Sequence, residues 1–151
     1  MAIGTDASIE FFGTADDLGS SSATVTDGSF SIASDVTQWT NDDDAEKAAI
    51  VLFCDWATAP DANSVVFLYA RLMNIDSTND QDVPDSNFQH TRLGAFPIND
   101  VTTNQYVAIE INLPNVYTSQ VYEFYVKNST GQTLQSGWKL IITPKASGPH
   151  A

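Results

Sequence analysis

Acidic side chains are concentrated in one short stretch, "DSTNDQDVPD", which spans residues 76–85 and carries four aspartates. Such a stretch can hold calcium, or it can be a solvated connection between two strands. An EF-hand loop counted from Asp76 needs glycine at its sixth position and glutamate at its twelfth, where this chain has Gln81 and Asn87. The sharp turn and the bidentate ligand are both missing. A weak, looser calcium site at this loop therefore stands only as the alternative to a solvated turn.

Two glutamates, Glu110 and Glu123, are the best candidates for paired-carboxylate chemistry. Retaining glycosidases use two carboxylates about 5–5.5 Å apart. If residues 105–113 and 121–128 formed a symmetric hairpin, the two side chains would lie opposite each other. If the strands belonged to different sheets, which the connection is long enough to allow, they would be ordinary outer-face charges. Because both glutamates alternate with apolar residues, the pattern favours the second interpretation.

Other catalytic signals are missing from the sequence. The histidines are His90, beside the acidic loop, and His150, near the end of the chain, and they form no cluster with cysteine that could bind zinc. The single cysteine, Cys54, lies within the apolar run "IVLFCDW", which predicts a buried and inert thiol. No phosphate-binding loop, dinucleotide fingerprint or serine nucleophile motif occurs. We therefore expect a protein that is not an enzyme and that uses no cofactor.

The charge balance restricts the partners. The 151 residues carry a formal net charge of −13, with six basic side chains. This argues against binding to nucleic acid, which needs clustered lysine and arginine, and against binding to an anionic membrane surface. The start of the chain, "MAIGTDASIEFF", has neither the basic region nor the long apolar run of a signal peptide. We expect a protein made in a cytoplasm, with a protein, a neutral sugar or a cation as partner.

Alternating apolar residues predict an all-β fold. About eight strands occur at spacings of roughly ten to fifteen residues, which is typical of a sandwich or barrel. The count fits a jelly-roll-like antiparallel β-sandwich. A single helical turn is expected within residues 42–49, before a strand. The residues expected to face the core are Ile50, Leu52, Cys54, Trp56, Val107, Ile109, Ile111, Leu113, Tyr122, Phe124, Val126, Trp138, Leu140 and Ile142.

The chain divides into three parts on this reading. Residues 1–22 form an N-terminal arm or edge strand followed by a loop at 13–22, and residues 23–144 form the sandwich. Pro144 is expected to end the last strand, because proline cannot donate to a strand ladder. Residues 145–151 are expected to form a flexible tail.

Aromatic side chains offer a second class of function, which is carbohydrate binding. Trp39, Tyr106, Tyr117 and Tyr125 could act as platforms for sugar rings, although their spacing does not separate them from edge or interface aromatics. The triplet at residues 128–130, Asn-Ser-Thr, matches a glycosylation sequon, but without a secretion signal it indicates only a turn.

Several motifs follow one another in a familiar order over residues 48–144. They are "IVLFCDWATAP", "NSVVFLYARLMNID" with the Asp/Asn-rich loop after it, "LGAFPI", "VTTNQYVAI", "YEFYVKNSTGQTL" and "GWKLIITP". This order resembles the small β-sandwich virion proteins of tailed bacteriophages, of the head decoration or cement type. The resemblance implies a non-enzymatic virion protein in many copies, of the kind that sits on the capsid surface and bridges major capsid protein subunits, and it leaves head, neck and tail positions open. It implies copies of the chain itself as partners as well. The alternative is a carbohydrate-binding or receptor-binding β-sandwich module of a phage tail.

Contact residues for such a role are expected in the N-terminal segment. Ile3, Ile9, Phe11 and Phe12 are apolar and have no obvious place in the sandwich. They are therefore our candidates for contacts with a partner protein. The alternative is that the segment is simply an edge strand of the sandwich.

Overall fold

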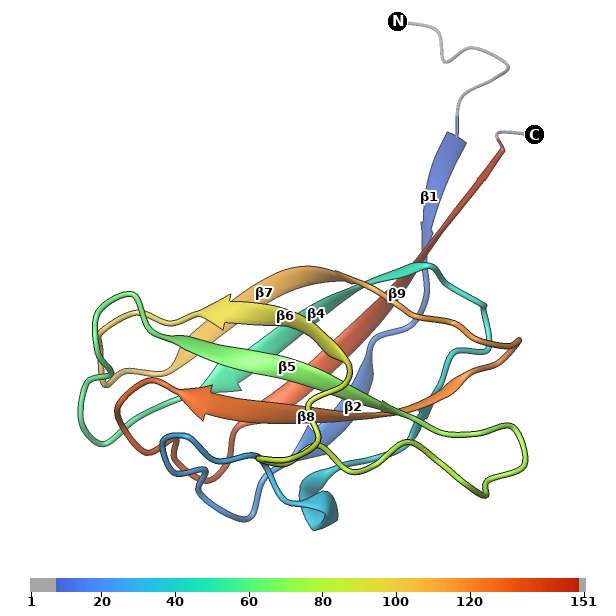
Figure 1. The fold of residues 1–151 in the computed structure, drawn as a ribbon. Helices are drawn as coiled ribbons and strands as arrows, with labels where there is room; N and C mark the ends of the chain where they lie inside the picture. Colours follow the sequence, from blue (N-terminus) through green and yellow to red (C-terminus); the bar gives the residue numbers. More distant parts are fainter. Residues whose placement is uncertain (1–7, 150–151) are drawn as a thin grey trace, which may run out of the picture.

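The computed structural model describes residues 8–149 of the chain. These residues form nine strands and one 3-10 turn, η1 (Figure 1). Their bounds are β1 Ser8–Phe12, β2 Asp16–Ser20, η1 Ala33–Asp35, β3 Trp39–Thr40, β4 Lys47–Cys54, β5 Val65–Leu72, β6 Arg92–Pro97, β7 Gln105–Asn112, β8 Val121–Ser129 and β9 Lys139–Pro149.

Two antiparallel sheets make up the fold. One has the order β1-β9-β4-β7, with β2 also paired to β9, and the other has the order β3-β8-β5-β6. The pairs β2·β9, β3·β8, β4·β7 and β5·β6 are each antiparallel, and the chain passes between the sheets at most connections. This is the arrangement of a long hairpin rolled into two sheets, which is a jelly roll. The expected all-β sandwich is confirmed, with nine strands in place of about eight.

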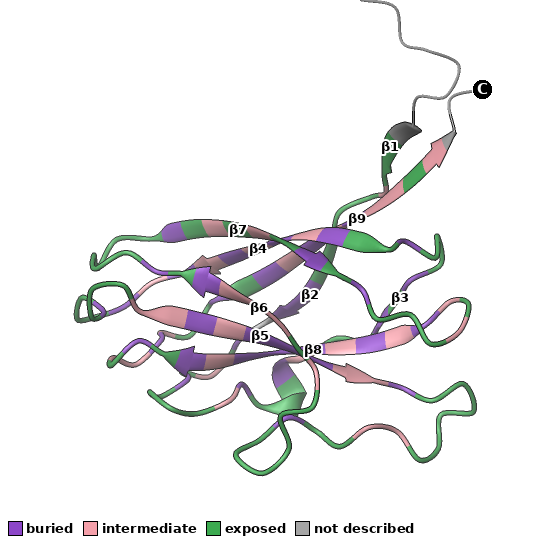
Figure 2. Cartoon of the chain, turned by 45° about the horizontal axis from the view of Figure 1, so that its top comes forward, coloured by how far each residue is buried: buried purple, intermediate pink, exposed green. Residues whose placement is uncertain are grey.

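The core lies between the two sheets. Strand β4 alternates between buried and half-buried positions, and Ile50, Leu52 and Cys54 are completely buried. Phe124 and Val126 of β8 are also completely buried, from the other sheet. Figure 2 shows this alternation of buried and more exposed residues along the strands. The period of two that the sequence displays therefore places one side of each strand in the core.

The segment that we expected to be a loop at 13–22 contains strand β2, so that expectation was wrong. Its backbone pairs with β9, and the register shifts at a bulge between Asp17 and Gly19. Leu18 is its one large apolar residue, and it is 99% buried in the core. A single apolar residue beside a glycine gives too little periodicity to predict a strand. Residues 16–20 thus belong to the sandwich and not to a separate arm.

Strand β9 continues past Pro144, where we expected it to end, and residues 145–149 of the expected flexible tail are part of it. The Pro144 carbonyl accepts a hydrogen bond from the Gly13 N–H at 2.9 Å. In a strand the N and C=O of one residue point to the same edge, so the missing donor of Pro144 faces the turn between β1 and β2 and not β4. No ladder bond to β4 is lost. Strand β1 then pairs with the rest of β9, from Phe12 opposite Lys145 onwards.

The helical turn expected within residues 42–49 is not formed. The Asn41 side chain accepts from the Ala45 N–H and donates to the Ala45 carbonyl, both at 2.9 Å, and Asp44 has a φ of 48°. These bonds close a local turn in place of helical hydrogen bonds. Strand β4 then begins at Lys47. Within residues 8–149 no helix is long and apolar enough to cross a membrane.

Candidate functional site

The two glutamates considered for catalysis are in different sheets. Glu110 is in β7 and Glu123 is in β8, and these strands do not pair. Each carboxylate instead has its own cationic partner, namely Lys145 for Glu110 and Arg71 for Glu123. The alternative that the two strands belong to different sheets is confirmed, so the glutamates form no glycosidase pair. Glu110 is an exposed outer-face charge as expected, whereas the Glu123 side chain is only 14% exposed and is not an ordinary surface charge.

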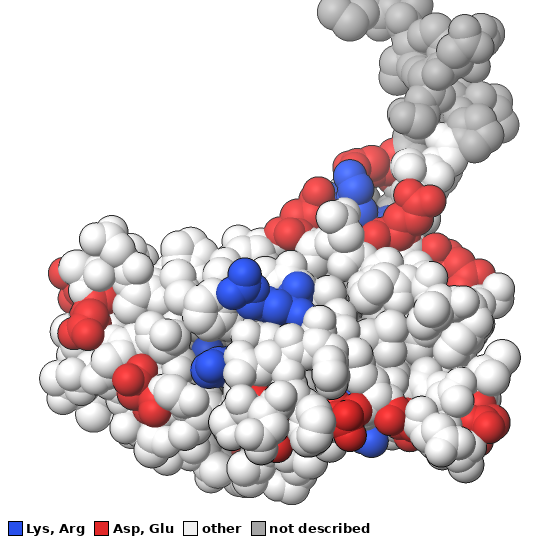
Figure 3. All heavy atoms as spheres, in the orientation of Figure 1, with Lys and Arg blue, Asp and Glu red and all other residues white. Residues whose placement is uncertain are grey.

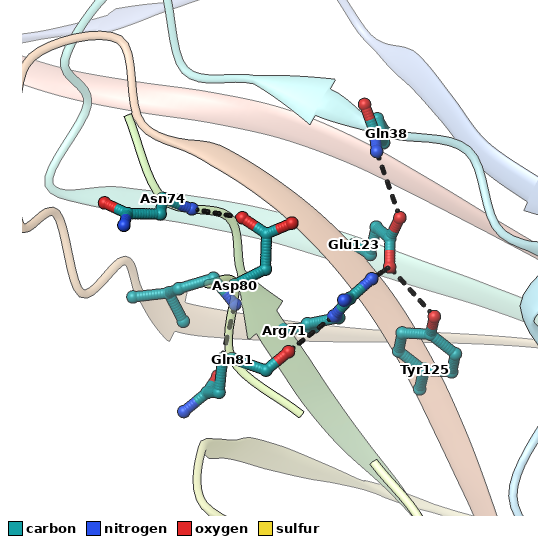
Figure 4. A network of polar contacts seen from close by, with 8 residues as sticks. Gln38, Arg71, Asn74, Asp80, Gln81, Glu123 and Tyr125 are labelled. Carbon is teal, nitrogen blue, oxygen red and sulfur yellow. Dashed lines mark hydrogen bonds and ion pairs between the residues drawn. The ribbon is translucent and has the colours of Figure 1, made fainter. Parts of the chain in front are cut away.

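Glu123 is the centre of a polar network that ties strands together (Figure 4). Its carboxylate accepts hydrogen bonds from Arg71 at 3.0 Å, from the Tyr125 hydroxyl at 2.9 Å and from the Gln38 amide at 3.1 Å. Burial raises the pKa of this carboxyl, but the three hydrogen bonds outweigh burial and hold the pKa below its ordinary value. Arg71 also donates to the Gln81 carbonyl at 2.6 Å. The network therefore anchors the loop after β5 and leaves Glu123 no role as a free acid or base.

Glu110 bridges the outer face of the other sheet. Lys145 of β9 donates a hydrogen bond to it, and Lys47 of β4 lies 4.0 Å from its carboxylate. The hydrogen bond with Lys145 lowers the pKa of Glu110 and raises the pKa of Lys145. Lys47 and Lys145 lie opposite each other in β4 and β9. Figure 3 shows acidic and basic side chains gathered where β1 and the end of β9 leave the sandwich. They are ordinary stabilising contacts of an exposed face.

The acidic loop at 76–85 does not gather its carboxylates. Asp76 accepts from the Thr78 N–H at 3.0 Å, and Asp80 accepts from the Asn74 N–H at 2.6 Å. Asp82 lies 3.8 Å from the His90 ring instead. Within residues 8–149 no group of three or more His, Cys, Asp and Glu side chains could hold a metal ion. The geometry gives the calcium alternative no support and makes these residues turn formers.

Two other residues were considered for chemistry, Cys54 and His90. Cys54 is completely buried, and burial raises the pKa of its thiol to about 12. The prediction of a buried thiol is therefore confirmed, and its inertness stays a prediction. The His90 side chain is 53% exposed, as expected for a solvated histidine.

The four aromatic candidates for sugar binding differ in how far their side chains are buried. Trp39 and Tyr125 are buried, so they cannot serve as platforms, and Tyr125 points its hydroxyl to Glu123. Tyr117 is half-buried and donates to the Met73 carbonyl at 2.5 Å. Only Tyr106 of these four is open to solvent, with 74% of it exposed.

A projecting arm is the most distinctive surface feature. Strand β1 and the last residues of β9 form a two-stranded ribbon that rises out of the sandwich (Figure 1). On it Phe11 is 55% exposed and Phe12 is 63% exposed. Ile9 is in β1 opposite Gly148, and Ile3 lies outside the described residues. Of the four expected contact residues, the two phenylalanines thus lie exposed on the ribbon, and as consecutive strand residues they point to its opposite faces.

The root of the arm is hollowed. A hollow of about 300 Å³ lies there, lined by Phe11, Phe12, Gly13, Asp43, Ala45, Pro144 and Ala146. The Lys145 ammonium lies 5.5 Å from the centre of the Phe12 ring. A hollow of this kind can receive a side chain from a neighbouring protein.

The arm also presents a free strand edge. Among the described strands β1 pairs with β9 alone, so the N–H and C=O groups of its other edge have no strand partner. An edge of this kind is a template to which a strand from another chain can add. Exposed phenylalanines beside such an edge supply the apolar area that makes strand addition favourable. The β9 half of the arm could not be foreseen, because its sequence, rich in Pro, Ser and Gly, resembles a loop.

Comparison with known proteins adds little to this geometry. No protein-family model matches the chain, and neither does any curated protein. One solved structure, described as a carbohydrate-binding module of the β-sandwich superfamily, is similar with a TM-score of 0.34 and 13% sequence identity. The likeness covers 97% of this chain and 58% of that chain, so this chain spans less than two thirds of its length. The β-sandwich assignment itself follows from the strand pairing.

Proposed function

We propose that this chain is a non-enzymatic structural protein of a bacteriophage virion, a decoration or cement protein that binds the outside of the head. The observation that carries the proposal is the β1–β9 arm, with Phe11 and Phe12 exposed beside a free strand edge. The order of sequence motifs over residues 48–144, which resembles such virion proteins, supports it. The arm would hold the protein on the major capsid protein, and copies of the chain would occupy equivalent positions of the symmetric shell.

The mechanism is binding that favours the assembled shell. A protein that binds the assembled state and not the separated subunits stabilises that state by mass action. The arm fits this role because its apolar side chains are separate from the core, so they can be buried against a partner without disturbing the sandwich. The acidic surface of the remaining chain, with its net charge of −13, would then face water.

Co-sedimentation with expanded, empty heads that lack the protein tests the proposal. The wild-type chain is expected to pellet with the heads and to raise the temperature at which they come apart. The double variant Phe11→Ser/Phe12→Ser is expected to stay in the supernatant. Its melting temperature should match that of the wild type, because both side chains lie largely in solvent.

A matched control separates the arm from apolar surface in general. Phe88 is 39% exposed on the loop before β6, so Phe88→Ser removes a partly exposed phenylalanine away from the arm. This variant should bind heads as the wild type does. Failure of the wild-type chain to bind heads would overturn the assignment to the capsid, and unchanged binding by the double arm variant would overturn the role of the arm.

A further inference from the structure

A groove lies at the end of the sandwich opposite the arm. Lys47 and Asn112 are paired near the root of the arm, whereas Cys54 and Gln105 are paired at the other end of the same two strands. There the β4–β5 loop, the β6–β7 loop and the start of β7 enclose a groove of about 580 Å³. Figure 1 shows these loops at the end away from β1. The volume is in the range of small-molecule sites, which is roughly 300–1,000 Å³.

Tyr106 forms an aromatic wall of this groove. The residue is 74% exposed, which is unusual for a side chain with so much apolar area. Its ring packs against Phe53 of the neighbouring strand, with centroids 4.9 Å apart and an interplanar angle of 45°. Phe53 therefore limits the motion of the Tyr106 ring while most of that ring stays in solvent. A fixed, exposed ring is a surface on which the C–H face of a sugar ring can pack.

Polar groups without internal partners line the same groove. The side chains of Asn63, Asn99 and Asp100 contribute to it, and within residues 8–149 none of them makes a hydrogen bond. A groove that combines an apolar wall with a few free donors and acceptors is typical of a ligand site.

The backbone around these groups is held in place before any ligand binds. The Gln105 side chain accepts from the Asn99 N–H at 3.0 Å and donates to the Asn99 carbonyl at 2.9 Å. Gln105 itself is 93% buried, so this clamp is well shielded from water. Asn63 has a positive φ of 60°, a conformation that is sparsely populated outside glycine. Such preorganisation lowers the entropy cost of binding.

Charge selects the class of ligand. Asp100 is the only charged residue of the groove, and the chain as a whole is strongly acidic. An anionic ligand would be repelled, whereas the hydroxyl groups of a neutral sugar can donate to the carboxylate and to the amide oxygens. We propose that this groove binds a neutral saccharide, with Tyr106 as the stacking platform and with Asn63, Asn99 and Asp100 as its polar contacts.

This site does not depend on what the arm binds. If both proposals hold, the arm fastens the chain at one end and the saccharide groove points away from the attachment. Each copy would then bind neutral glycans weakly. The particle would bind them through many copies at once, so its overall avidity would come from multivalency.

The test is binding to a panel of neutral and of sialylated or sulfated oligosaccharides, followed by NMR titration with the best neutral glycan. The wild-type chain is expected to bind neutral glycans only. Tyr106→Ala should weaken binding about tenfold or more, and Tyr106→Phe should stay within about threefold, because stacking needs the ring and not the hydroxyl. Asp100→Asn should weaken binding to an intermediate extent.

Controls separate this proposal from folding and from the arm. Each variant should melt like the wild type, and Phe88→Ala, at an exposed aromatic outside the groove, should bind glycan unchanged. The Phe11→Ser/Phe12→Ser variant should also bind glycan unchanged, so loss of head binding and loss of sugar binding are read independently. Absence of neutral glycan binding, preference for anionic glycans, or equal binding by Tyr106→Ala would each overturn the proposal. Binding of an extended peptide along β7 in place of sugar would overturn it as well.

Discussion

Arg71 and Glu123 lie opposite each other in strands β5 and β8, and the guanidinium donates to the carboxylate across 3.0 Å. Both side chains are mostly buried, at 22% and 14% exposed. Because the same Arg71 donates to the Gln81 carbonyl, this ion pair joins two strands and the middle of the acidic loop. The pair is a structural element of the outer face of this sheet.

Acid is therefore expected to destabilise the protein through Glu123. Its pKa in the folded state lies below the ordinary value of 4.5, so its contribution is complete above that pH. The contribution is lost as the pH falls through the lowered pKa, because protonation removes the ion pair. Glu123→Gln should reduce the free energy of unfolding by about 1–3 kcal/mol at pH 7. Urea unfolding between pH 7 and pH 3 measures both effects.

The control for this prediction is Glu46→Gln, at an exposed glutamate that has no ion pair among the described residues. That variant should keep the stability and the pH profile of the wild type. Glu123→Gln should instead show a flatter profile below pH 4.5. Parallel profiles for Glu123→Gln and the wild type would contradict the assignment of acid sensitivity to this pair.

Gly19 is expected to be intolerant of any side chain. Its φ is +148°, and a Cβ atom there would lie 2.2 Å from the Asp35 carbonyl oxygen. Gly28 has a φ of +77° but no atom within 4 Å of the same position. Gly19→Ala should therefore cost about 3 kcal/mol or more, and Gly28→Ala only about 1–2 kcal/mol of backbone strain. Equal losses in denaturant unfolding would show that the β2 bulge can move away from Asp35.

The Cys54 thiol should be unreactive until the protein unfolds. With a pKa of about 12 and no exposed area, it presents neither a thiolate nor access to reagent. At pH 8 the rate at which an aromatic disulfide reagent labels Cys54 should rise in proportion to the unfolded fraction as the urea concentration is increased. Rapid labelling of the folded protein without urea would contradict the burial of this strand end.

The sequence predicts the central strands well, and the reason is their periodicity. In residues 47–54 and 121–127 the side chains at every second position, among them Ile50, Leu52 and Phe124, are apolar and are buried between the sheets, although the other face of 47–54 is apolar as well. The same alternation placed Glu110 and Glu123 on outer faces. Burial in a sandwich has a period of two, so a sequence that repeats with this period carries the information by itself.

The arm and the groove depend on contacts between segments that are distant in the chain, and the local sequence of each segment does not reveal these contacts. Strand β2 is held by backbone bonds to β9 with only Leu18 in the core, and β9 passes through Pro144 because that residue faces a turn. The groove brings Asn63 beside Asn99 and Tyr106, which belong to a segment much later in the chain. Tyr106 was among the candidates from the sequence, but only the fold distinguishes it from the buried Tyr125.

Asn128 shows how a motif changes meaning in the fold, and it provides the last prediction. It begins the sequon-like triplet, yet it is completely buried near the end of β8, so a glycan could not be attached to the folded protein. Its amide donates to the Val25 and Gln132 carbonyls at 2.8 and 2.6 Å and accepts from the Thr130 hydroxyl at 2.7 Å. Asn128→Ala would leave all three groups without this partner.

The expected cost of Asn128→Ala is about 2–4 kcal/mol of unfolding free energy, since three buried hydrogen bonds of about 1 kcal/mol each are lost. Thermal and urea unfolding measure this cost. Ser129→Ala, at the exposed neighbour with no side-chain hydrogen bond among the described residues, should change stability by less than about 0.5 kcal/mol. A cost below about 1 kcal/mol for Asn128→Ala would contradict this prediction. It would mean that water replaces the amide and that this corner of the sandwich is open to solvent.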